Sequence, residues 1–248
     1  KFTAFQDKSE LTAGFMWQTL TRQSGKYQLK AQVTSFVPLA DNVEIMHVEL
    51  CNIGSTAQTI TPTAAIPVFG RSADNIRDHR HVTSLLHRIK TTDYGVYVKP
   101  TLSFDERGHR KNELTYFVCG VTGTGEKPNG FYPVVEDYIG EGGSYTHPRK
   151  IIQNEDGVSG GCCFAGKEAL GGVRFPTIVL EPKACVSYTI IMGMTEQEDG
   201  IERILSNYTT SEKVKDALTK VRDYWQKKVN VRYDTGNGQY DNLLRWIS

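Results

Sequence analysis

Tyr27-Gln28-Leu29-Lys30-Ala31-Gln32-Val33-Thr34-Ser35-Phe36 alternates apolar and polar side chains with a period of two. This is the pattern of a β-strand with one buried face. Residues 43–50 show the same alternation with a break in phase near His47, and a turn at residues 39–42 separates the two stretches. The pair predicts two successive strands joined by a short turn.

Further β-rich stretches follow along the chain with little helical pattern between them: residues 56–63, 94–98, 114–121, 173–180 and 184–194. The tripeptide Glu181-Pro182-Lys183 is expected to form the turn between the last two. Many short strands at such spacing are typical of a sandwich or a barrel. We therefore expect a mainly β fold, a large β-sandwich, over residues 1–194.

A helical pattern replaces the strands at Thr195. Residues 195–198 and 209–212 each have the spacing of a capping box, and each precedes apolar residues that share one helical face. These are Ile201, Ile204, Leu205 and Tyr208 in the first helix, and Val214, Leu218, Val221, Trp225 and Val229 in the second. We expect a helical linker over residues 195–239.

A third helix is predicted from Asp241, with Leu243, Leu244, Trp246 and Ile247 as its apolar residues. Such side chains need a surface against which to be buried. We expect residues 240–248 to be the truncated start of a further domain. Without that domain the apolar side chains are expected to stay exposed and to promote association.

Composition excludes several classes of function. The 248 residues are 39% hydrophobic and 23% charged, with a formal net charge of +1, which fits a globular protein and gives no basic surface for nucleic acid. No apolar stretch approaches the length of a membrane span and no signal peptide is visible. The expected location is the cytoplasm, with no membrane and no nucleic acid as partner.

The five cysteines show no framework spacing. Their odd number argues against a disulfide scaffold, so reduced thiols are expected. Cys162 and Cys163 are interpreted as small buried residues in a Gly-rich strand or turn rather than as a metal or redox pair.

The densest run of charged residues has four arginines, two aspartates and three histidines within eighteen positions. It reads Arg71-Ser72-Ala73-Asp74-Asn75-Ile76-Arg77-Asp78-His79-Arg80-His81-Val82-Thr83-Ser84-Leu85-Leu86-His87-Arg88. Three interpretations stay open: an anion or sugar site, a metal site at His79 and His81, and a structural ion-pair network. The network is favoured because the aspartates compensate much of the arginine charge. The metal site is disfavoured because further ligands are lacking, so no metal is expected.

This run strongly resembles the N-terminal domain of glycoside hydrolase family 94, the inverting glycoside phosphorylases. The resemblance is greatest to the 1,2-β-oligoglucan phosphorylases and to the related module of cyclic β-1,2-glucan synthases. It implies a supersandwich of the galactose-mutarotase type.

A second segment, Gly140-Glu141-Gly142-Gly143-Ser144-Tyr145-Thr146-His147-Pro148-Arg149, combines glycines with an aromatic, hydroxyls and a base. Such a loop is either an ordinary surface loop or a ligand site in which Tyr145 stacks on a sugar and Arg149 binds hydroxyls or phosphate. Cellobiose phosphorylases carry a similar loop, in which Gly143 here takes the place of an arginine and Tyr145 that of a tryptophan. The resemblance implies substrate binding by Ser144, Tyr145, Thr146 and Arg149, with the loop reaching the active site of the neighbouring protomer in a homodimer.

Residues 240–248 resemble the start of the family's (α/α)6 barrel, which carries the catalytic aspartate and the phosphate pocket. No catalytic residue is therefore expected in this chain, which should be inactive alone. The resemblance implies a parent enzyme that converts β-1,2-glucan oligosaccharides and inorganic phosphate to α-glucose 1-phosphate, with no cofactor. The alternatives are a module of a cyclic β-1,2-glucan synthase and a non-catalytic carbohydrate-binding module.

Overall fold

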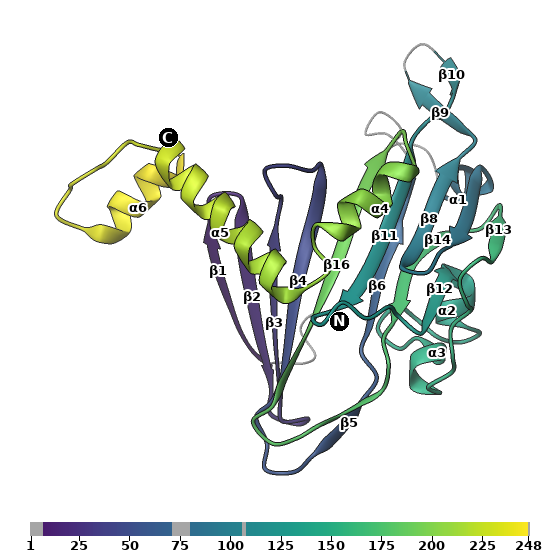
Figure 1. Cartoon of the computed structure of the whole chain (residues 1–248), viewed down its shortest axis with the longest axis horizontal. Helices are drawn as coiled ribbons and strands as arrows, with labels where there is room; N and C mark the ends of the chain where they lie inside the picture. The colour runs from purple at the N-terminus through teal and green to yellow at the C-terminus, as the bar shows by residue number, and fades with distance from the viewer. Residues whose placement is uncertain (1–6, 71–79, 106–107, 248) are drawn as a thin grey trace.

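Strands dominate the computed structural model, which describes residues 7–70, 80–105 and 108–247 (Figure 1). Within these residues, nine antiparallel strands form one large sheet: β1 (Lys8–Gly14), β2 (Trp17–Ser24), β3 (Leu29–Phe36), β4 (Val43–Asn52), β7 (His87–Thr91), β8 (Gly95–Pro100), β11 (Thr115–Thr122), β13 (Cys163–Ala165) and β16 (Cys185–Thr195). Their order across the sheet is β1-β2-β3-β4-β16-β11-β8-β7-β13.

The two alternating stretches form β3 and β4, which pair with Phe36 opposite Ile45. Burial explains the break in phase near His47. Val43 and Ile45 belong to a core cluster on one face of the sheet, whereas Met46 and Val48 pack against a second cluster on the other face. Because β4 is covered on both sides, its sequence cannot keep a simple alternation.

A smaller sheet covers part of the large one and completes the sandwich. Its strands, in spatial order, are β12 (Gly130–Val134), β14 (Ala169–Arg174) and β6 (Thr63–Val68). Gly171 lets the sheets approach closely, because a Cβ atom there would overlap the side chain of Val118. The predicted mainly β sandwich is confirmed.

Two short strand pairs lie outside these sheets: β5 (Gln58–Ile60) with β15 (Ile178–Leu180), and β9 (Leu102–Asp105) with β10 (Gly108–Lys111). The predicted strands at residues 56–63 and 173–180 are each divided in two. Pro62 and Pro176 lie at the divisions and cannot donate to a strand ladder. The predicted turn before β16 is present, with Ala184 N donating to Glu181 O at 3.0 Å.

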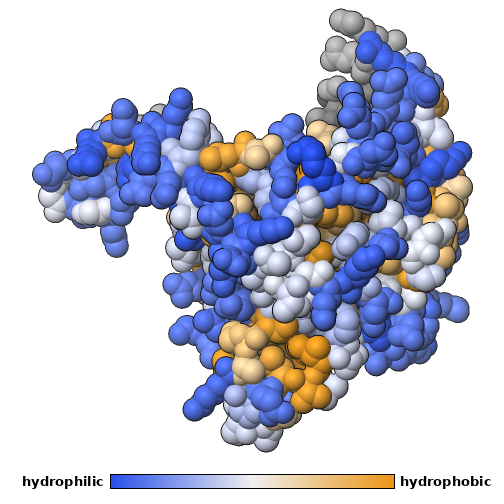
Figure 2. Space-filling view, viewed as in Figure 1, coloured by the Kyte–Doolittle hydropathy of each residue, from blue (hydrophilic) through white to orange (hydrophobic). Residues whose placement is uncertain are grey.

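Two helices, α4 (Asp199–Ser206) and α5 (Ser211–Lys228), cover the other face of the large sheet (Figure 1). Their predicted apolar faces and the strands beneath them form one core cluster. Its members include Phe36, Ile45, Phe117 and Ile191 from the strands, and Ile201, Leu205, Val214 and Val221 from the helices. The outer side of α5 is hydrophilic (Figure 2). The division of the chain at residue 194 stays a prediction.

The predicted capping boxes are wrong in detail. Glu198 precedes α4 without a side-chain cap, and the Thr195 hydroxyl instead accepts from Gln197 N in a local turn at 3.1 Å. The cap of α5 is Thr210, one residue later than predicted, and its hydroxyl accepts from Lys213 N at 3.4 Å.

The last helix, α6 (Gly238–Ile247), begins three residues before the predicted start at Asp241. Leu243, Trp246 and Ile247 are exposed, as the sequence predicts, whereas Leu244 is half-buried. The Trp246 ring stacks on Phe15, with centroids 5.5 Å apart.

The expectation of five reduced cysteines is wrong for one pair, because Cys51 of β4 and Cys185 of β16 form a disulfide. The strand register places these residues opposite each other. Cys163 is exposed and Cys162 is half-buried, whereas both were expected to be buried. Reduced thiols therefore no longer support the cytoplasmic prediction. Across the described ranges, the helices are all too short or too polar to cross a membrane.

Candidate functional site

The four predicted sugar-binding residues lie on one connection between two short helices, α2 (Val135–Ile139) and α3 (Arg149–Ile152). The buried strand β12 runs directly into α2, so the connection is fixed to the smaller sheet at its start. Ser144, Tyr145 and Thr146 form the tip of the connection, and Arg149 begins α3.

The glycines of this connection meet backbone requirements. Gly140 and Gly142 have φ values of 69° and 71°, a region that favours glycine. Gly143 packs so closely that a Cβ atom there would overlap the carbonyl oxygen of Ile139. This backbone therefore has no room for the arginine that cellobiose phosphorylases carry at the matching position.

The tip is a tight turn whose hydroxyls contact each other. Ser144 N donates to His147 O at 3.2 Å, and His147 N donates back to Ser144 O at 3.0 Å. The Ser144 and Thr146 hydroxyl oxygens lie 3.1 Å apart and are exposed. Two adjacent hydroxyls with rotatable hydrogens can each donate to or accept from a ligand hydroxyl.

Tyr145 brings the tip beside the C-terminal end of the dense charged run. Tyr145 is 44% exposed and lines a small cavity with Thr83, Ser84 and His87. The cavity holds only about 10 Å³, which is too small for a sugar. A sugar could therefore reach Tyr145 only from its exposed side.

His87 is a structural residue in this cavity. Its Nε2 lies 2.9 Å from Phe69 O, and its Nδ1 lies 3.2 Å from Lys167 O. Burial lowers the pKa of His87 more than these two carbonyl groups raise it. A neutral imidazole can donate through only one of the two nitrogens.

The structure describes only the C-terminal end of the dense run. Residues 71–79 lie outside the described part of the chain, and so do the side chains of Arg80 and His81. The predicted ion-pair network and the His79–His81 interpretation therefore stay predictions. The described end of the run begins with α1 (Arg80–Leu85) and finishes at the exposed Arg88, whose Nη1 donates to His87 O at 2.9 Å.

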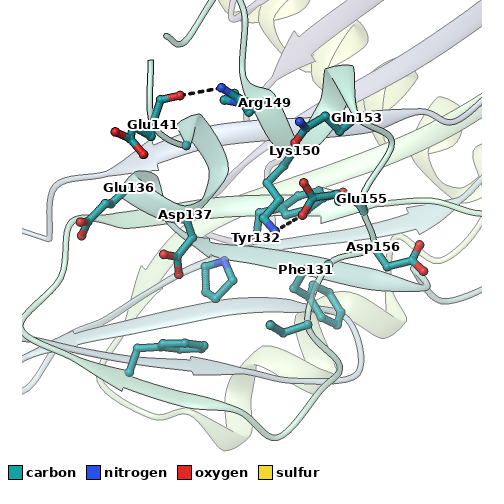
Figure 3. Close-up of a pocket in the computed structure, with 15 residues that line it drawn as sticks. Phe131, Tyr132, Glu136, Asp137, Glu141, Arg149, Lys150, Gln153, Glu155 and Asp156 are labelled. Atoms are coloured by element: carbon teal, nitrogen blue, oxygen red, sulfur yellow. Dashed lines mark hydrogen bonds and ion pairs between the residues drawn. The ribbon is translucent and has the colours of Figure 1, made fainter. Parts of the chain in front are cut away.

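Arg149 faces a different region, an open cleft of about 500 Å³ between α2, α3 and residues 153–158. Figure 3 shows Asp137 on one side of this cleft and the Lys150–Glu155 ion pair on the other, with Phe131 below them. We call this the α2–α3 cleft. Its lining is Phe131, Tyr132, Pro133, Glu136, Asp137, Gly140, Glu141, Arg149, Lys150, Gln153, Glu155, Asp156, Gly157, Val158 and Phe164.

The structure thus separates the four predicted residues into the exposed tip, with Ser144, Tyr145 and Thr146, and the cleft, with Arg149. Sequence reasoning missed the carboxylates of the cleft. They show no diagnostic spacing, and only their density between residues 136 and 156 could have been a signal. Among the described residues there is no group of three or more histidine, cysteine or acidic side chains that could hold a metal.

Comparison with known proteins gives one family and several remote structures. The model of the glycosyl hydrolase 94 supersandwich domain matches residues 5–211. A search among curated proteins gives no match.

Among solved structures, a bacterial glucoamylase complexed with acarbose is 11% identical with a TM-score of 0.54, covering 92% of this chain and 29% of that one. A putative kojibiose phosphorylase from the human microbiome is 10% identical with a TM-score of 0.41, covering 85% of this chain and 23% of that one. The chain thus spans less than a third of the length of each of these two proteins. At such identities the likeness to the glucoamylase shows the fold alone. The family match confirms the resemblance seen in the sequence: the chain belongs to glycoside hydrolase family 94 and contains its supersandwich domain.

Proposed function

We propose that this chain is the N-terminal domain of an inverting glycoside phosphorylase that acts on β-1,2-linked gluco-oligosaccharides. Family membership over residues 5–211 is the observation that carries the proposal. The glycine-built loop of residues 140–149, with a half-exposed tyrosine at its tip, supports a contact with sugar.

The proposed reaction is phosphorolysis. Phosphate attacks the anomeric carbon from the face opposite the leaving group, while a carboxylic acid protonates the departing glycosidic oxygen. Phosphate replaces the water of an inverting glycosidase, so no general base is needed, and a β-glucoside yields α-glucose 1-phosphate. We assign the acid and the phosphate pocket to an (α/α)6 barrel of the same parent protein. The chemistry requires inorganic phosphate as co-substrate and no metal or organic cofactor.

In this proposal the domain supports a homodimer and lends its loop to the acceptor site of the neighbouring protomer. Tyr145 would stack on the acceptor sugar, while the hydroxyls of Ser144 and Thr146 and the guanidinium of Arg149 would bind its hydroxyl groups. The close packing of Gly143 supports a substrate other than cellobiose.

The test is an assay of the full-length parent protein with sophorose-type oligosaccharides and phosphate. We expect glucose 1-phosphate as product, and its absence with every β-linked glucan would contradict the proposal. The Tyr145→Ala variant should raise the KM for the acceptor in the synthetic direction. Tyr27→Ala, at a tyrosine that is 59% exposed in the turn between β2 and β3, is the matched control.

A module of a cyclic β-1,2-glucan synthase is the alternative within the same family. A glycosyltransferase domain and membrane spans in the same reading frame would favour it.

A further inference from the structure

We propose that the outer edge of β1 pairs with β1 of a second copy of this chain. The two strands run antiparallel about a two-fold axis at Leu11, so that two nine-stranded sheets join into one continuous sheet.

Strand β1 is a long edge strand without the features that usually protect an edge. Among the strands that the structure describes, only β2 pairs with it. Its seven residues contain no proline and pair with β2 without a bulge. The other edge strand, β13, has only three residues. Short strands, prolines and bulges are the usual protection against pairing with another chain, so β1 is the edge at which a further strand can be added.

The register of the sheet shows which backbone groups of β1 face outward. In an antiparallel sheet, alternate residues of a strand bond to the neighbour on either side. Ile53 N donates to Gln28 O at 2.9 Å in the pair that continues the register of β4 with β3, so the even-numbered residues of β3 bond to β4. Following this alternation through β2 leaves the even-numbered residues of β1 bonded to β2. The N–H and C=O groups of Ser9, Leu11 and Ala13 therefore point away from the sheet.

Only one antiparallel register pairs two copies of β1 along their whole length. It places Leu11 opposite Leu11 and pairs the other residues that are equally far from it: Ser9 with Ala13, Glu10 with Thr12, and Lys8 with Gly14. The outward backbone groups of one copy then meet those of the other, and no like charges lie directly opposite each other. A shift that places Glu10 opposite Glu10 shortens the pairing and opposes like charges, which destabilises a strand pair.

A row of exposed leucines crosses the proposed junction. Leu11 pairs with Leu20 of β2, and the two residues are 64% and 46% exposed. The row continues through Val33 of β3 to Val48 of β4, which packs against the second core cluster. Because opposite residues of paired strands lie on the same face, the Leu11 side chains of the two copies become neighbours. Pairing thus removes from water the apolar surface that this otherwise mostly polar hairpin exposes.

This interface is separate from the loop contact in the proposed function. β1 and β13 are the two edges of the large sheet, and α2 and α3, which flank the loop at residues 140–149, lie on the β13 side (Figure 1). Pairing through β1 leaves the loops of the two copies at the outer ends of the joined sheet. It therefore does not depend on the proposed function and uses a different part of the surface.

Sedimentation of the 248-residue chain over a range of concentrations tests the pairing. We expect a monomer–dimer equilibrium. Leu11→Lys places two ammonium groups opposite each other and removes the leucine contact, so it should raise the dissociation constant at least about tenfold. Thr12→Lys introduces the same side chain one position along, where it faces Glu10 of the second copy, and should dimerise at least as tightly as the unaltered chain. Both positions are exposed, so both variants should keep the fold, which urea unfolding checks.

Amide hydrogen exchange measured by NMR gives a readout of the backbone itself. Raising the protein concentration should increase the protection of the amides of Ser9, Leu11 and Ala13. The amides of Glu10 and Thr12 already bond to β2, so their protection should not change.

Four results would each overturn the pairing: a chain that stays monomeric at its highest soluble concentration, equal dissociation constants for Leu11→Lys and the unaltered chain, loss of the dimer in Thr12→Lys, or exchange at the three outward amides that does not depend on concentration. Leu243→Lys, at an exposed leucine of α6, should leave the dimer intact. Loss of the dimer in this variant and not in Leu11→Lys would assign the association to α6 instead. None of these measurements uses phosphorolysis, so failure of the proposed function would be recognised independently.

Discussion

The Tyr208 hydroxyl donates a 2.8 Å hydrogen bond to Asp41 Oδ2, although the two residues are 167 positions apart. Asn207 Nδ2 reaches the same oxygen at 3.2 Å, and Arg203 lies 3.6 Å from Oδ1. Asp41 occupies the turn between β3 and β4, and the Asp41 carboxylate is 2% exposed. One buried carboxylate thus connects the helical segment to the turn that the sequence predicts between the first two strands.

Replacing Asp41 should loosen this connection. Asp41→Ala leaves the buried Tyr208 hydroxyl and the Asn207 amide without their acceptor, and we expect a loss of about 3 kcal/mol in the free energy of unfolding. Asp41→Asn keeps one carbonyl oxygen and should lose less. Urea unfolding measures both, with the exposed Asp223→Ala as the control. Equal stability of Asp41→Ala and the unaltered chain would contradict the role given to this carboxylate.

His47 should make the domain less stable in acid. It is buried between β4 and α5, and neither ring nitrogen has a hydrogen-bond partner in the described ranges. Burial lowers the pKa of His47, Lys215 on α5 lowers it further, and Glu49 raises it. Because the folded-state pKa lies below the unfolded value of about 6.5, stability is complete above that pH and falls as the pH drops towards the folded pKa.

The measurement for His47 is urea unfolding at a series of pH values from about 7.5 to about 5, a range that spans the unfolded pKa of histidine. The pKa of His87 is lowered as well, so replacing His47 alone should reduce the loss of stability in acid rather than abolish it. His47→Leu should flatten the pH profile, whereas the exposed His109→Leu should not. Parallel profiles for His47→Leu and the unaltered chain would refute the assignment.

Gly143 should tolerate no side chain in this loop. A Cβ atom would overlap the Ile139 carbonyl, so Gly143→Ala forces the backbone to shift, at a cost of roughly 1–3 kcal/mol. Hydrogen exchange should show the change at residues 139–149. Gly200→Ala, where a Cβ atom meets nothing within 4 Å in α4, is the matched control and should be neutral or slightly stabilising. Unchanged exchange in Gly143→Ala would show that the loop backbone is not restricted by this contact.

The sequence predicts strands that carry an apolar period and misses strands that carry none. In β7, buried and exposed residues alternate, but the buried ones are His87, Ile89 and Thr91, so no apolar period marks it. β3 carries the alternation at Leu29, Ala31 and Val33 and was predicted to within two residues of its start, although its two buried residues, Thr34 and Phe36, lie on the opposite face. β1 is exposed along most of its length, so no apolar period marks it, and it appeared in no prediction. The ends of α4 and α5 depended on turn geometry that a capping pattern approximates only to within a few residues.

The candidate site was predictable only where residue types cluster along the chain. The loop at residues 140–149 combines glycines, hydroxyls and an aromatic within ten positions, so it was recognised. The acidic lining of the α2–α3 cleft comes from α2, from the connection after it and from the loop after α3, and folding alone brings Asp137 opposite Glu155. The separation of Arg149 from Tyr145 depends on the turn at Ser144–His147, which residue types do not reveal.

The pairing of Cys51 with Cys185 shows the same limit and gives the last prediction. The two residues are 134 positions apart, and only the register of β4 with β16 brings them together. Closing so long a loop restricts the unfolded chain, and in the chain-entropy model it contributes about 4–5 kcal/mol. Urea unfolding of Cys51→Ser/Cys185→Ser should therefore show a clear loss of stability, and a reductant should bring the unaltered chain to the same value. Cys163→Ser, at an exposed free thiol, should behave like the unaltered chain under both conditions. If the reductant has no effect and mass spectrometry finds five free thiols in the oxidised protein, the disulfide does not form in solution, and the original argument for reduced cysteines is restored.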